Sequence, residues 1–371
     1  MDILLSGYTG LGNFVLKTPM LQAFKHIFPE ANIDFICGND PAVAELAALQ
    51  PSLIRKIHWL PNNATWQTKM QFFKSQILPL QYKAIILPFD AQPNFLLVGS
   101  YMAKIPLRIA HKPVYTNKRT LFARAIQQFF TIFWPTALVP LSKNRHETLL
   151  NMDLLTVLLP KLGQSAAAIP PILPTSIKFA NAIELLEGYG LTLKQYIVLQ
   201  PCAANGEAIV KTWHPHNFAQ LINKLQTQFG QYKIVLVGSA GDRNAALQTL
   251  LPLLSNPQDI VNTMGETNIN QLLNLLQYAR LVVCHDSGVM HFADALATPL
   301  LALYGPTDHT RTRPLRPSSH TLVAQGEWCN AMGYFALTEA DLAAKGVSYQ
   351  PLQSLSVEMV FEKIIPFLRA K

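Results

Sequence analysis

The sequence is poor in charge and in cysteine. Charged residues make up 14% of its 371 residues and hydrophobic residues 50%, whereas an ordinary soluble domain has roughly 25% charged residues. The chain is therefore too apolar to be disordered. Its four cysteines lie far apart with no CxxC pair, so they support neither a disulfide framework nor a zinc site: Cys37, Cys202, Cys284 and Cys329. Their wide spacing predicts that the four cysteines are reduced thiols in a cytosolic protein.

Long hydrophobic runs are also absent. No segment reaches the roughly 18–20 uninterrupted apolar residues of a transmembrane helix, and the best run, residues 129–141, is broken by Pro135 and Pro140. The first six residues lack a basic region and have the pattern of a strand, so we expect no secretory signal. These features predict a cytoplasmic protein that does not span a bilayer.

Acidic residues are missing from residues 91–146. The formal net charge of +8 lies wholly in the first half, because residues 1–185 carry 17 basic and 9 acidic residues, whereas residues 186–371 carry 13 of each. The acid-free stretch holds aromatic residues and the basic residues Lys104, Arg108, Lys112, Lys118, Arg119, Arg124, Lys143 and Arg145. Such a stretch suits an anionic membrane surface, a phosphorylated glycolipid or a nucleic acid, and equally a solvated face over an ordinary core.

Short apolar runs alternate with longer helical patterns along the whole chain. The runs lie at 2–6, 33–37, 84–88, 196–200, 233–237, 281–284 and 300–304. Apolar strands that alternate with helices predict parallel sheets covered on both faces. Residues 168–176 contain Pro170, Pro171 and Pro174, which cannot continue a helix. We therefore predict two α/β domains with a linker in this region.

A glycine-containing turn follows the first strand. Gly7, Gly10 and Gly12 permit unusual backbone angles and let a ligand approach the main chain. The spacing is GxxGxG and not the GxGxxG of dinucleotide-binding turns, so a nicotinamide cofactor is poorly supported. The alternative is a tight turn without chemical use.

Two further candidates follow strands of the second half. Lys211 lies in a loop that leads from a strand into a helix, where its ammonium could clamp a phosphate, while the neighbouring Trp213 fits a core position. Asp242 follows the strand at 233–237 and either accepts hydrogen bonds from a ribose diol or caps the next helix.

The segment His285-Asp286-Ser287-Gly288-Val289-Met290-His291 leads from a buried strand into a helix expected at 289–297. Asp286 and Ser287 are good helix caps, and the free amides at such a helix start bind anions, so a diphosphate would suit this place. The plainer interpretation is that Asp286 only caps the helix and that His291 is a core histidine. The spacing matches no catalytic zinc signature, so we expect no metal.

In their order, these segments resemble glycosyltransferase family 9, the ADP-heptose:lipopolysaccharide heptosyltransferase family. The resemblance covers residues 1–320, and its order and spacing are more specific than any single motif. It rests on Gly10-Leu11-Gly12-Asn13, Thr18-Pro19, Phe28-Pro29, Phe89-Asp90-Ala91-Gln92, Arg108-Ile109, Lys211-Thr212-Trp213, Asp286-Ser287-Gly288-Val289-Met290-His291, Thr298-Pro299 and Gly305-Pro306-Thr307-Asp308.

The resemblance implies a GT-B fold, in which two Rossmann-like α/β domains face a cleft. It implies a basic acceptor-side domain at 1–170, a donor-binding domain at 171–355 and a C-terminal helix at 356–371 that crosses back to the first domain. The donor-binding residues it implies are Lys211, Thr212, Asp242, Met264, Asp286, Ser287, Gly288 and His291. Those it implies on the acceptor side are Gly10, Gly12, Asn13, Gln92 and Arg108.

One departure from the family concerns the chemistry. The family carries an aspartate, thought to be the general base, where this chain has Asn13, and an amide cannot accept the proton of a hydroxyl. Three hypotheses follow: Asp90 replaces it as the base, or Asn13 only orients an acceptor that needs little deprotonation, or the protein binds a nucleotide sugar without transferring it. The catalytic candidates are therefore Asn13, Asp90 and Lys211.

The leading functional hypothesis is an inverting, metal-independent glycosyltransferase that needs no cofactor besides its nucleoside-diphosphate sugar. It would move a heptose or a related sugar to a lipopolysaccharide-core or other glycan acceptor. The alternatives are a catalytically silent sugar-nucleotide-binding protein and a sugar-nucleotide epimerase. Because the basic stretch belongs to the acceptor-side domain, we expect an anionic, lipid-anchored acceptor at the cytoplasmic face of the inner membrane and no nucleic acid.

Overall fold

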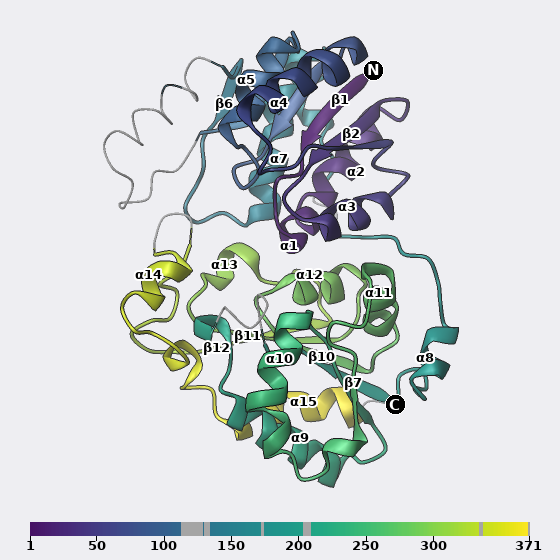
Figure 1. Cartoon of the computed structure of the whole chain (residues 1–371), viewed down its shortest axis with the longest axis vertical. Coiled ribbons are helices and arrows are strands. Elements are labelled where there is room, and N and C mark those ends of the chain that lie inside the picture. Colours follow the sequence, from purple (N-terminus) through teal and green to yellow (C-terminus); the bar gives the residue numbers. More distant parts are fainter. Residues whose placement is uncertain (113–128, 130–133, 172–173, 203–208, 334–336, 370–371) are drawn as a thin grey trace. The chain divides into compact units, whose positions relative to one another are not determined.

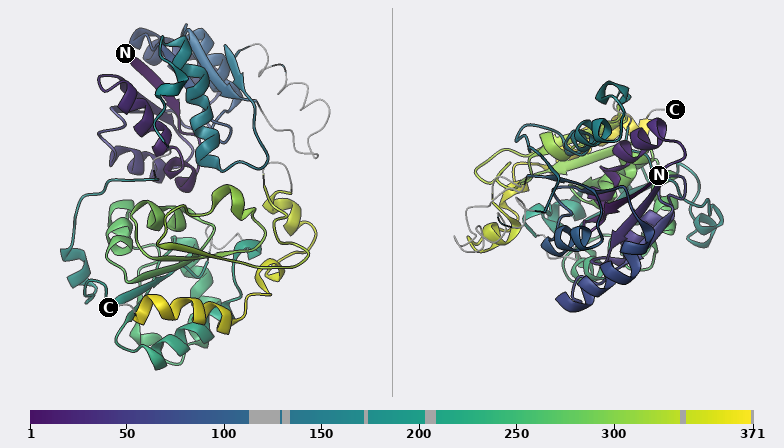
Figure 2. Two further views of the ribbon diagram at one scale, coloured as in Figure 1. Left: turned by 180° about the vertical axis from the view of Figure 1, so that it is seen from behind. Right: turned by 90° about the horizontal axis from the view of Figure 1, so that it is seen from above.

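The computed structural model describes all residues except 113–128, 130–133, 172–173, 203–208, 334–336 and 370–371 (Figure 1). The chain divides into two compact units, Met1–Lys178 and Phe179–Lys371. Helices lie on both faces of the sheet in each unit (Figures 1 and 2). No helix among the described residues is long and apolar enough to cross a membrane.

The first unit is built on a parallel six-stranded sheet with the order β3-β2-β1-β4-β5-β6. Its strands are β1 (Asp2–Ser6), β2 (Asn32–Cys37), β3 (Lys56–Trp59), β4 (Ala84–Leu87), β5 (Leu107–His111) and β6 (Ala137–Val139). Its helices are α1 (Leu11–Val15), α2 (Thr18–Ile27), α3 (Pro41–Ala48), α4 (Trp66–Phe72), α5 (Asn94–Met102) and α7 (Glu147–Lys161). Pro19 opens α2 in the first turn, where its missing amide hydrogen costs nothing.

The second unit repeats this arrangement with the order β12-β11-β10-β7-β8-β9. Its strands are β7 (Tyr196–Leu199), β8 (Lys233–Leu236), β9 (Ile260–Asn262), β10 (Leu281–His285), β11 (Leu300–Tyr304) and β12 (Ser319–Val323). Its helices are α8 (Glu184–Gly188), α9 (Pro215–Gln228), α10 (Ala240–Thr249), α11 (Ile269–Gln277), α12 (Gly288–Ala295), α13 (His309–Thr312), α14 (Glu339–Ala343) and α15 (Val357–Arg369). The prediction of doubly wound α/β domains is confirmed.

Hydrogen bonds fix the point where the chain leaves the first unit. Lys178 is held there, because its backbone N–H donates to Oε1 of Gln50 at 2.7 Å and its carbonyl accepts from Nε2 of Gln50 at 2.9 Å. Two residues later, the N–H of Ala180 donates to Oδ1 of Asn270 on α11 at 2.7 Å. The crossing therefore lies at 178–179, a few residues beyond the linker expected at 168–176 and the division expected at 170.

The last helix, α15, packs within the second unit. Its buried residues Val360, Phe361 and Ile364 belong to the core that also contains residues of α9 and β7. Lys224 of α9 pairs with Glu358 at 2.8 Å. The apolar side that the sequence pattern revealed is thus used inside this unit, and a return of the helix to the first domain stays a prediction.

A buried carboxylate ties together the strands at one edge of the first sheet. Asp34 of β2 accepts two hydrogen bonds from Arg55, at 2.8 and 2.7 Å, and one from the hydroxyl of Tyr82 at 2.5 Å. Burial alone would raise the pKa of Asp34, but hydrogen bonds from His58, Arg55 and Tyr82 outweigh it and hold the pKa well below its usual range. The ionised form of Asp34 is therefore part of the folded structure.

We predict that Asp34→Asn lowers stability and flattens its pH dependence. A group with a lowered pKa contributes stability above its unfolded pKa of about 3.9 and loses it as pH falls toward the folded value. The substitution should cost about 1–3 kcal/mol at pH 7, and calorimetric unfolding of the full chain at pH 7 and pH 3 should show a smaller acid-induced drop in Tm than in the wild type. Asp153→Asn, which breaks a partly exposed pair with Arg145, is the control. Equal acid sensitivity of wild type and Asp34→Asn would contradict this account.

Candidate functional site

Each sheet has one position at which its strand order reverses. In the first unit this is between β1 and β4, and in the second it is between β7 and β10. Loops that leave the carboxyl ends of two such strands diverge to opposite faces, which opens a crevice where ligands of doubly wound proteins bind. Segments that follow these four strands contain most of the residues singled out in the sequence.

The glycine turn leaves β1 and enters α1 directly. Gly7 has no room for a side chain, because a Cβ there would lie 1.9 Å from Cζ of Phe35. Gly10, by contrast, has nothing within 4 Å of such a position, so its backbone borders open space. Gly12 and Asn13 lie on α1, and both are partly exposed. The turn is thus shaped by packing at Gly7 and is open at Gly10.

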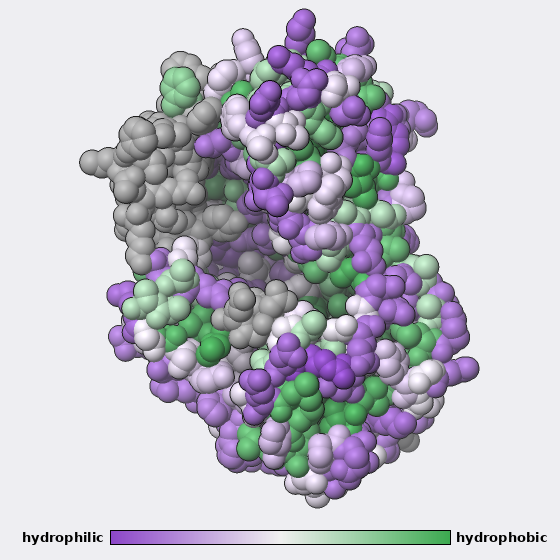
Figure 3. All heavy atoms as spheres, in the orientation of Figure 1, coloured by the Kyte–Doolittle hydropathy of each residue, from purple (hydrophilic) through white to green (hydrophobic). Residues whose placement is uncertain are grey.

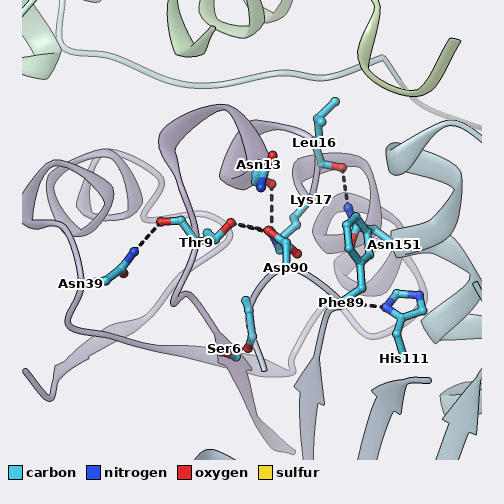
Figure 4. Close-up of polar contacts among 11 residues, drawn as sticks. Ser6, Thr9, Asn13, Leu16, Lys17, Asn39, Phe89, Asp90, His111 and Asn151 are labelled. Atoms are coloured by element: carbon cyan, nitrogen blue, oxygen red, sulfur yellow. Dashed lines mark hydrogen bonds and ion pairs between the residues drawn. The ribbon is translucent and has the colours of Figure 1, made fainter. Parts of the chain in front are cut away.

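A buried ion pair lies beside Asn13 (Figure 4). Nζ of Lys17 is 2.5 Å from Oδ2 of Asp90, and the two side chains are 0% and 2% exposed. The ammonium also donates to the backbone carbonyl of Asn13 at 3.1 Å and to Oγ1 of Thr9 at 3.3 Å. Thr9 in turn donates its hydroxyl to Oδ2 of Asp90. The structure therefore brings the two predicted catalytic residues, Asn13 and Asp90, together through a lysine that the sequence analysis did not single out.

The two carboxylate oxygens of Asp90 have different surroundings. Oδ2 accepts from Lys17 and Thr9, whereas Oδ1 is buried and has no hydrogen-bond partner among the described residues. An unpaired buried acceptor is costly and calls for an explanation such as a ligand or an ordered water. The neighbouring backbone is fixed by His111, whose Nδ1 accepts the N–H of Phe89 at 3.0 Å. Burial lowers the pKa of His111 to about 4, so its ring stays neutral at pH 7.

The other two acceptor-side candidates differ in their placement. Gln92 follows Asp90 at the carboxyl end of β4, and its Oε1 is buried without a partner among the described residues. Arg108 lies near the amino end of β5, where its guanidinium donates to the carbonyls of Ile105 at 2.6 Å and Trp134 at 2.5 Å. In a parallel sheet that is the end opposite Gly10 and Asp90, so Arg108 braces the fold and does not join them.

In the second unit, Lys211 and Asp286 lie together. Nζ of Lys211 is 3.5 Å from Oδ2 of Asp286, with the lysine side chain 23% exposed and the aspartate 11%. Burial would raise the pKa of Asp286, but the charges of Lys211 and His291 and a hydrogen bond from Thr312 outweigh it and lower the pKa. Asp286 is therefore a carboxylate that holds Lys211 at the edge of this crevice.

The turn after Asp286 starts α12. Ser287 is the N-cap residue by position, but its hydroxyl donates to Oε1 of Gln200 at 2.5 Å and makes no cap hydrogen bond. The expectation that the Ser287 side chain caps the helix is therefore wrong. Gly288 opens the helix, and the buried His291 lies one turn further on. Among the described residues no side chain caps α12, so the first amides of this helix are open to another acceptor, as an anion site requires.

Three donor-side candidates are used within the fold. Oδ2 of Asp242 accepts the N–H and the hydroxyl of Ser239 in a capping box at the start of α10, so the helix-cap interpretation describes its observed contacts. Asp242 is the third residue of α10, and Ser239 is the N-cap residue of this helix. The side chain of Met264 is 0% exposed and part of the core. Thr212 is 6% exposed. The side chain of Met264 cannot reach a ligand in this structure.

Among the described residues, no group of three or more His, Cys, Asp or Glu side chains could hold a metal ion. Metal-independent chemistry stays a prediction.

The sequence profile of glycosyltransferase family 9 (heptosyltransferase) matches residues 155–333. Lipooligosaccharide heptosyltransferase 2 of Haemophilus influenzae is 25% identical over 98% of both chains. The protein of the same name from Haemophilus ducreyi is 28% identical over 85% of this chain and 86% of its own length. The solved structure of Escherichia coli ADP-heptose lipopolysaccharide heptosyltransferase II matches with a TM-score of 0.72 at 21% identity, over 99% of this chain and 98% of that one.

The chain is therefore similar to glycosyltransferase family 9 over the residues that the profile matches, and to heptosyltransferases over nearly its whole length. The GT-B fold class that the resemblance implied is confirmed. Asn13 stands where the resemblance leads us to expect an aspartate, and the charged groups beside it are Lys17 and Asp90.

We predict that Lys17→Met strongly destabilises the first unit, because it leaves Asp90 charged, buried and without its cation. Removing one partner of a buried pair costs about 3–5 kcal/mol, whereas replacing both partners is often nearly neutral. Tm should therefore fall in Lys17→Met and recover in Lys17→Met/Asp90→Asn. Lys74→Met, at an exposed position after α4, is the control. A double variant as unstable as Lys17→Met would show that the pair is not the cause.

Proposed function

We propose that the chain is an inverting glycosyltransferase that transfers a heptose from a nucleoside-diphosphate sugar to a lipopolysaccharide-core acceptor. The observation that carries this proposal is the pairing of Lys211 with the start of α12 at the strand-order reversal of the second unit. The relatives that cover nearly the whole chain are named heptosyltransferases. Both the names of these relatives and the residues of this site support transfer of a heptose from a nucleoside-diphosphate sugar.

The second unit supplies the leaving-group side of the reaction. When the bond between the anomeric carbon and the diphosphate breaks, negative charge builds on the departing phosphate oxygens. Lys211 and the free amides at Gly288 and the following residues place positive potential where this charge develops. Asp286 keeps Lys211 at this edge before the donor arrives. ADP-heptose is the donor we propose, since the related Escherichia coli enzyme is named for it.

The first unit supplies the acceptor side. In the leading hypothesis the acceptor hydroxyl attacks the anomeric carbon from the face opposite the diphosphate, which inverts the configuration, and Oδ1 of Asp90 takes the hydroxyl proton. Its unpaired state fits this role, while its other oxygen is held by Lys17 and Thr9. The competing hypothesis gives Asn13 an orienting role with little deprotonation before attack. Neither needs a metal or a further cofactor.

We further propose that the acceptor is anionic and lipid-anchored and that the protein works at the cytoplasmic face of the inner membrane, without nucleic acid. The support is the acid-free, basic stretch at 91–146. Lys118, Arg119 and Arg124 of that stretch lie outside the described residues. On the face shown in Figure 3, hydrophilic and hydrophobic side chains are interspersed over the described part of the first unit.

Two alternatives stand beside transfer. UDP-N-acetylglucosamine 2-epimerase of Methanocaldococcus jannaschii shares the fold with a TM-score of 0.52 at 13% identity, which is a likeness of fold alone. A silent sugar-nucleotide-binding protein is the alternative that Asn13 motivates. Product formed only with an acceptor supports transfer, a donor altered without acceptor supports an epimerase, and binding without turnover supports the silent protein.

We predict that Lys211→Ala lowers kcat by about 10²–10³-fold with an unchanged Tm, since it removes one preorganised contact to the developing charge. The assay measures ADP release and product mass from ADP-heptose and a lipopolysaccharide-core fragment. Lys224→Ala, on α9 and paired with Glu358, is the matched lysine control and should keep wild-type turnover. Wild-type turnover in Lys211→Ala would contradict the assignment.

The base hypotheses make different predictions for two substitutions. If Asp90 is the base, Asp90→Asn lowers kcat by about 10²–10⁴-fold. Asn13→Asp then changes kcat little. If Asn13 only orients an acceptor that needs little deprotonation, Asp90→Asn changes kcat little once its effect on Tm is accounted for. Both variants are assayed side by side with the same substrates, with calorimetry of each to separate lost folding from lost chemistry.

A further inference from the structure

His285 joins the two loops that carry the proposed diphosphate contacts. Its Nε2 accepts a hydrogen bond from the backbone N–H of Trp213 at 2.9 Å. Trp213 lies two residues after Lys211, and His285 immediately precedes Asp286. The bond therefore connects the segment after β7 directly to the turn after β10, across the strand-order reversal.

Trp213 is fixed at its other end as well. Its side chain is 0% exposed, and its indole Nε1 donates to the carbonyl of Leu355 at 2.9 Å. Its ring meets Phe218 edge-on with the ring centres 5.2 Å apart, and Phe218 meets the ring of His285 at 5.5 Å. Because both the backbone and the side chain of Trp213 are hydrogen-bonded, the backbone of Lys211, two residues earlier, has little freedom to move.

The chemistry of His285 suits a permanent acceptor. The ring is 0% exposed, and burial lowers its pKa to about 3, so it stays neutral at pH 7. Because Nε2 accepts, the ring proton lies on Nδ1, and that N–H has no acceptor among the described residues. An apolar side chain would avoid the cost of this unpaired donor. What a histidine gains over an apolar side chain at this buried position is therefore the hydrogen bond from Trp213.

We propose that His285 is a positioning residue for sugar transfer. By accepting the Trp213 amide it holds Lys211 against Asp286, where the lysine ammonium meets the donor diphosphate. His285 itself touches no substrate. The proposal rests on the function proposed above for Lys211, and it extends that site to His285, for which the sequence analysis predicted no role.

Two substitutions test the bond itself. His285→Leu removes the acceptor, and a misplaced Lys211 should lower kcat by about 10- to 100-fold. His285→Gln offers an amide oxygen near the place of Nε2 and should keep most of the activity. His285→Asn stays polar but is too short to reach the Trp213 amide, so it should also lower kcat by about 10- to 100-fold. It provides the test if His285→Leu fails to fold. Equal losses in His285→Gln and His285→Asn would overturn the proposal.

A double-mutant cycle tests whether His285 acts through Lys211. If it does, adding His285→Asn to Lys211→Ala should lower kcat by less than about twofold, because the lysine it positions is already gone. Phe229→Leu is the matched control: it loosens the same hydrophobic core where Phe229 packs on Phe361, and it should lower Tm while leaving kcat close to wild type. A His285→Asn loss as large in Lys211→Ala as in the wild type would overturn the proposal.

Binding of ADP, measured by titration calorimetry on the full chain, separates the two proposals. Lys211→Ala and His285→Asn should both weaken ADP binding, with the larger effect in Lys211→Ala, and Phe229→Leu should not. Wild-type ADP affinity and turnover in Lys211→Ala would contradict the proposed function of the site. Weakened binding in Lys211→Ala with wild-type affinity in His285→Asn would contradict only the positioning role.

Discussion

The strand order of the two sheets is the constraint on which the rest depends. Each sheet reverses its order once, between β1 and β4 and between β7 and β10. Only there do neighbouring loops separate and leave strand ends and helix starts open to a ligand. Asp90 and the glycine turn border one reversal, and Lys211 and Asp286 border the other. The strand order therefore determines which edge of each sheet can hold a ligand-binding site, and the candidate residues lie at these edges.

The two ion pairs at these edges differ in solvent exposure and in the distance between the charged atoms. Lys17 and Asp90 are 0% and 2% exposed, so moving either charge toward a ligand would require a new partner inside the protein. Lys211 is 23% exposed and lies 3.5 Å from Asp286, a longer contact that a phosphate oxygen can replace. The first pair therefore suits a fixed support that leaves one carboxylate oxygen for chemistry. The second suits a cation that exchanges partners as the donor binds and leaves.

Much of this could be predicted from the sequence, and the gaps have physical causes. Most of the central strands were found because they are buried on both faces and form apolar runs in the sequence, as in β7 and β11. The central strand β5, which contains Arg108, was missed. The edge strands β3, β6, β9 and β12 were missed because their exposed or half-buried residues break that pattern. The linker was expected too early, since proline content marks where a helix ends and cannot show that Gln50 holds Lys178.

At the sites, local motifs predicted the places better than the partners. Asn13, Asp90, Lys211 and Asp286 lie beside the strand-order reversals, which the sequence analysis did not predict. Arg108 and Met264 make contacts within the fold, because strand direction and core packing are not visible in a motif. Lys17 was missed, although a lysine inside the apolar run from Phe14 to Leu21 is a signal of a buried charge.

That lysine also bears on the departure at Asn13. Its ammonium donates hydrogen bonds to the backbone carbonyl of Asn13 and to Asp90. Because the side chain at position 13 is a neutral amide, the side chains of Asn13, Lys17 and Asp90 together have no net charge when Lys17 and Asp90 are ionised. An aspartate at position 13 would add a second carboxylate beside the first, with one cation between them. The asparagine leaves a neutral turn beside a single carboxylate, so the anionic acceptor that we propose would meet less repulsion there. The residue that stands in place of the expected aspartate therefore also removes a negative charge that would oppose such an acceptor.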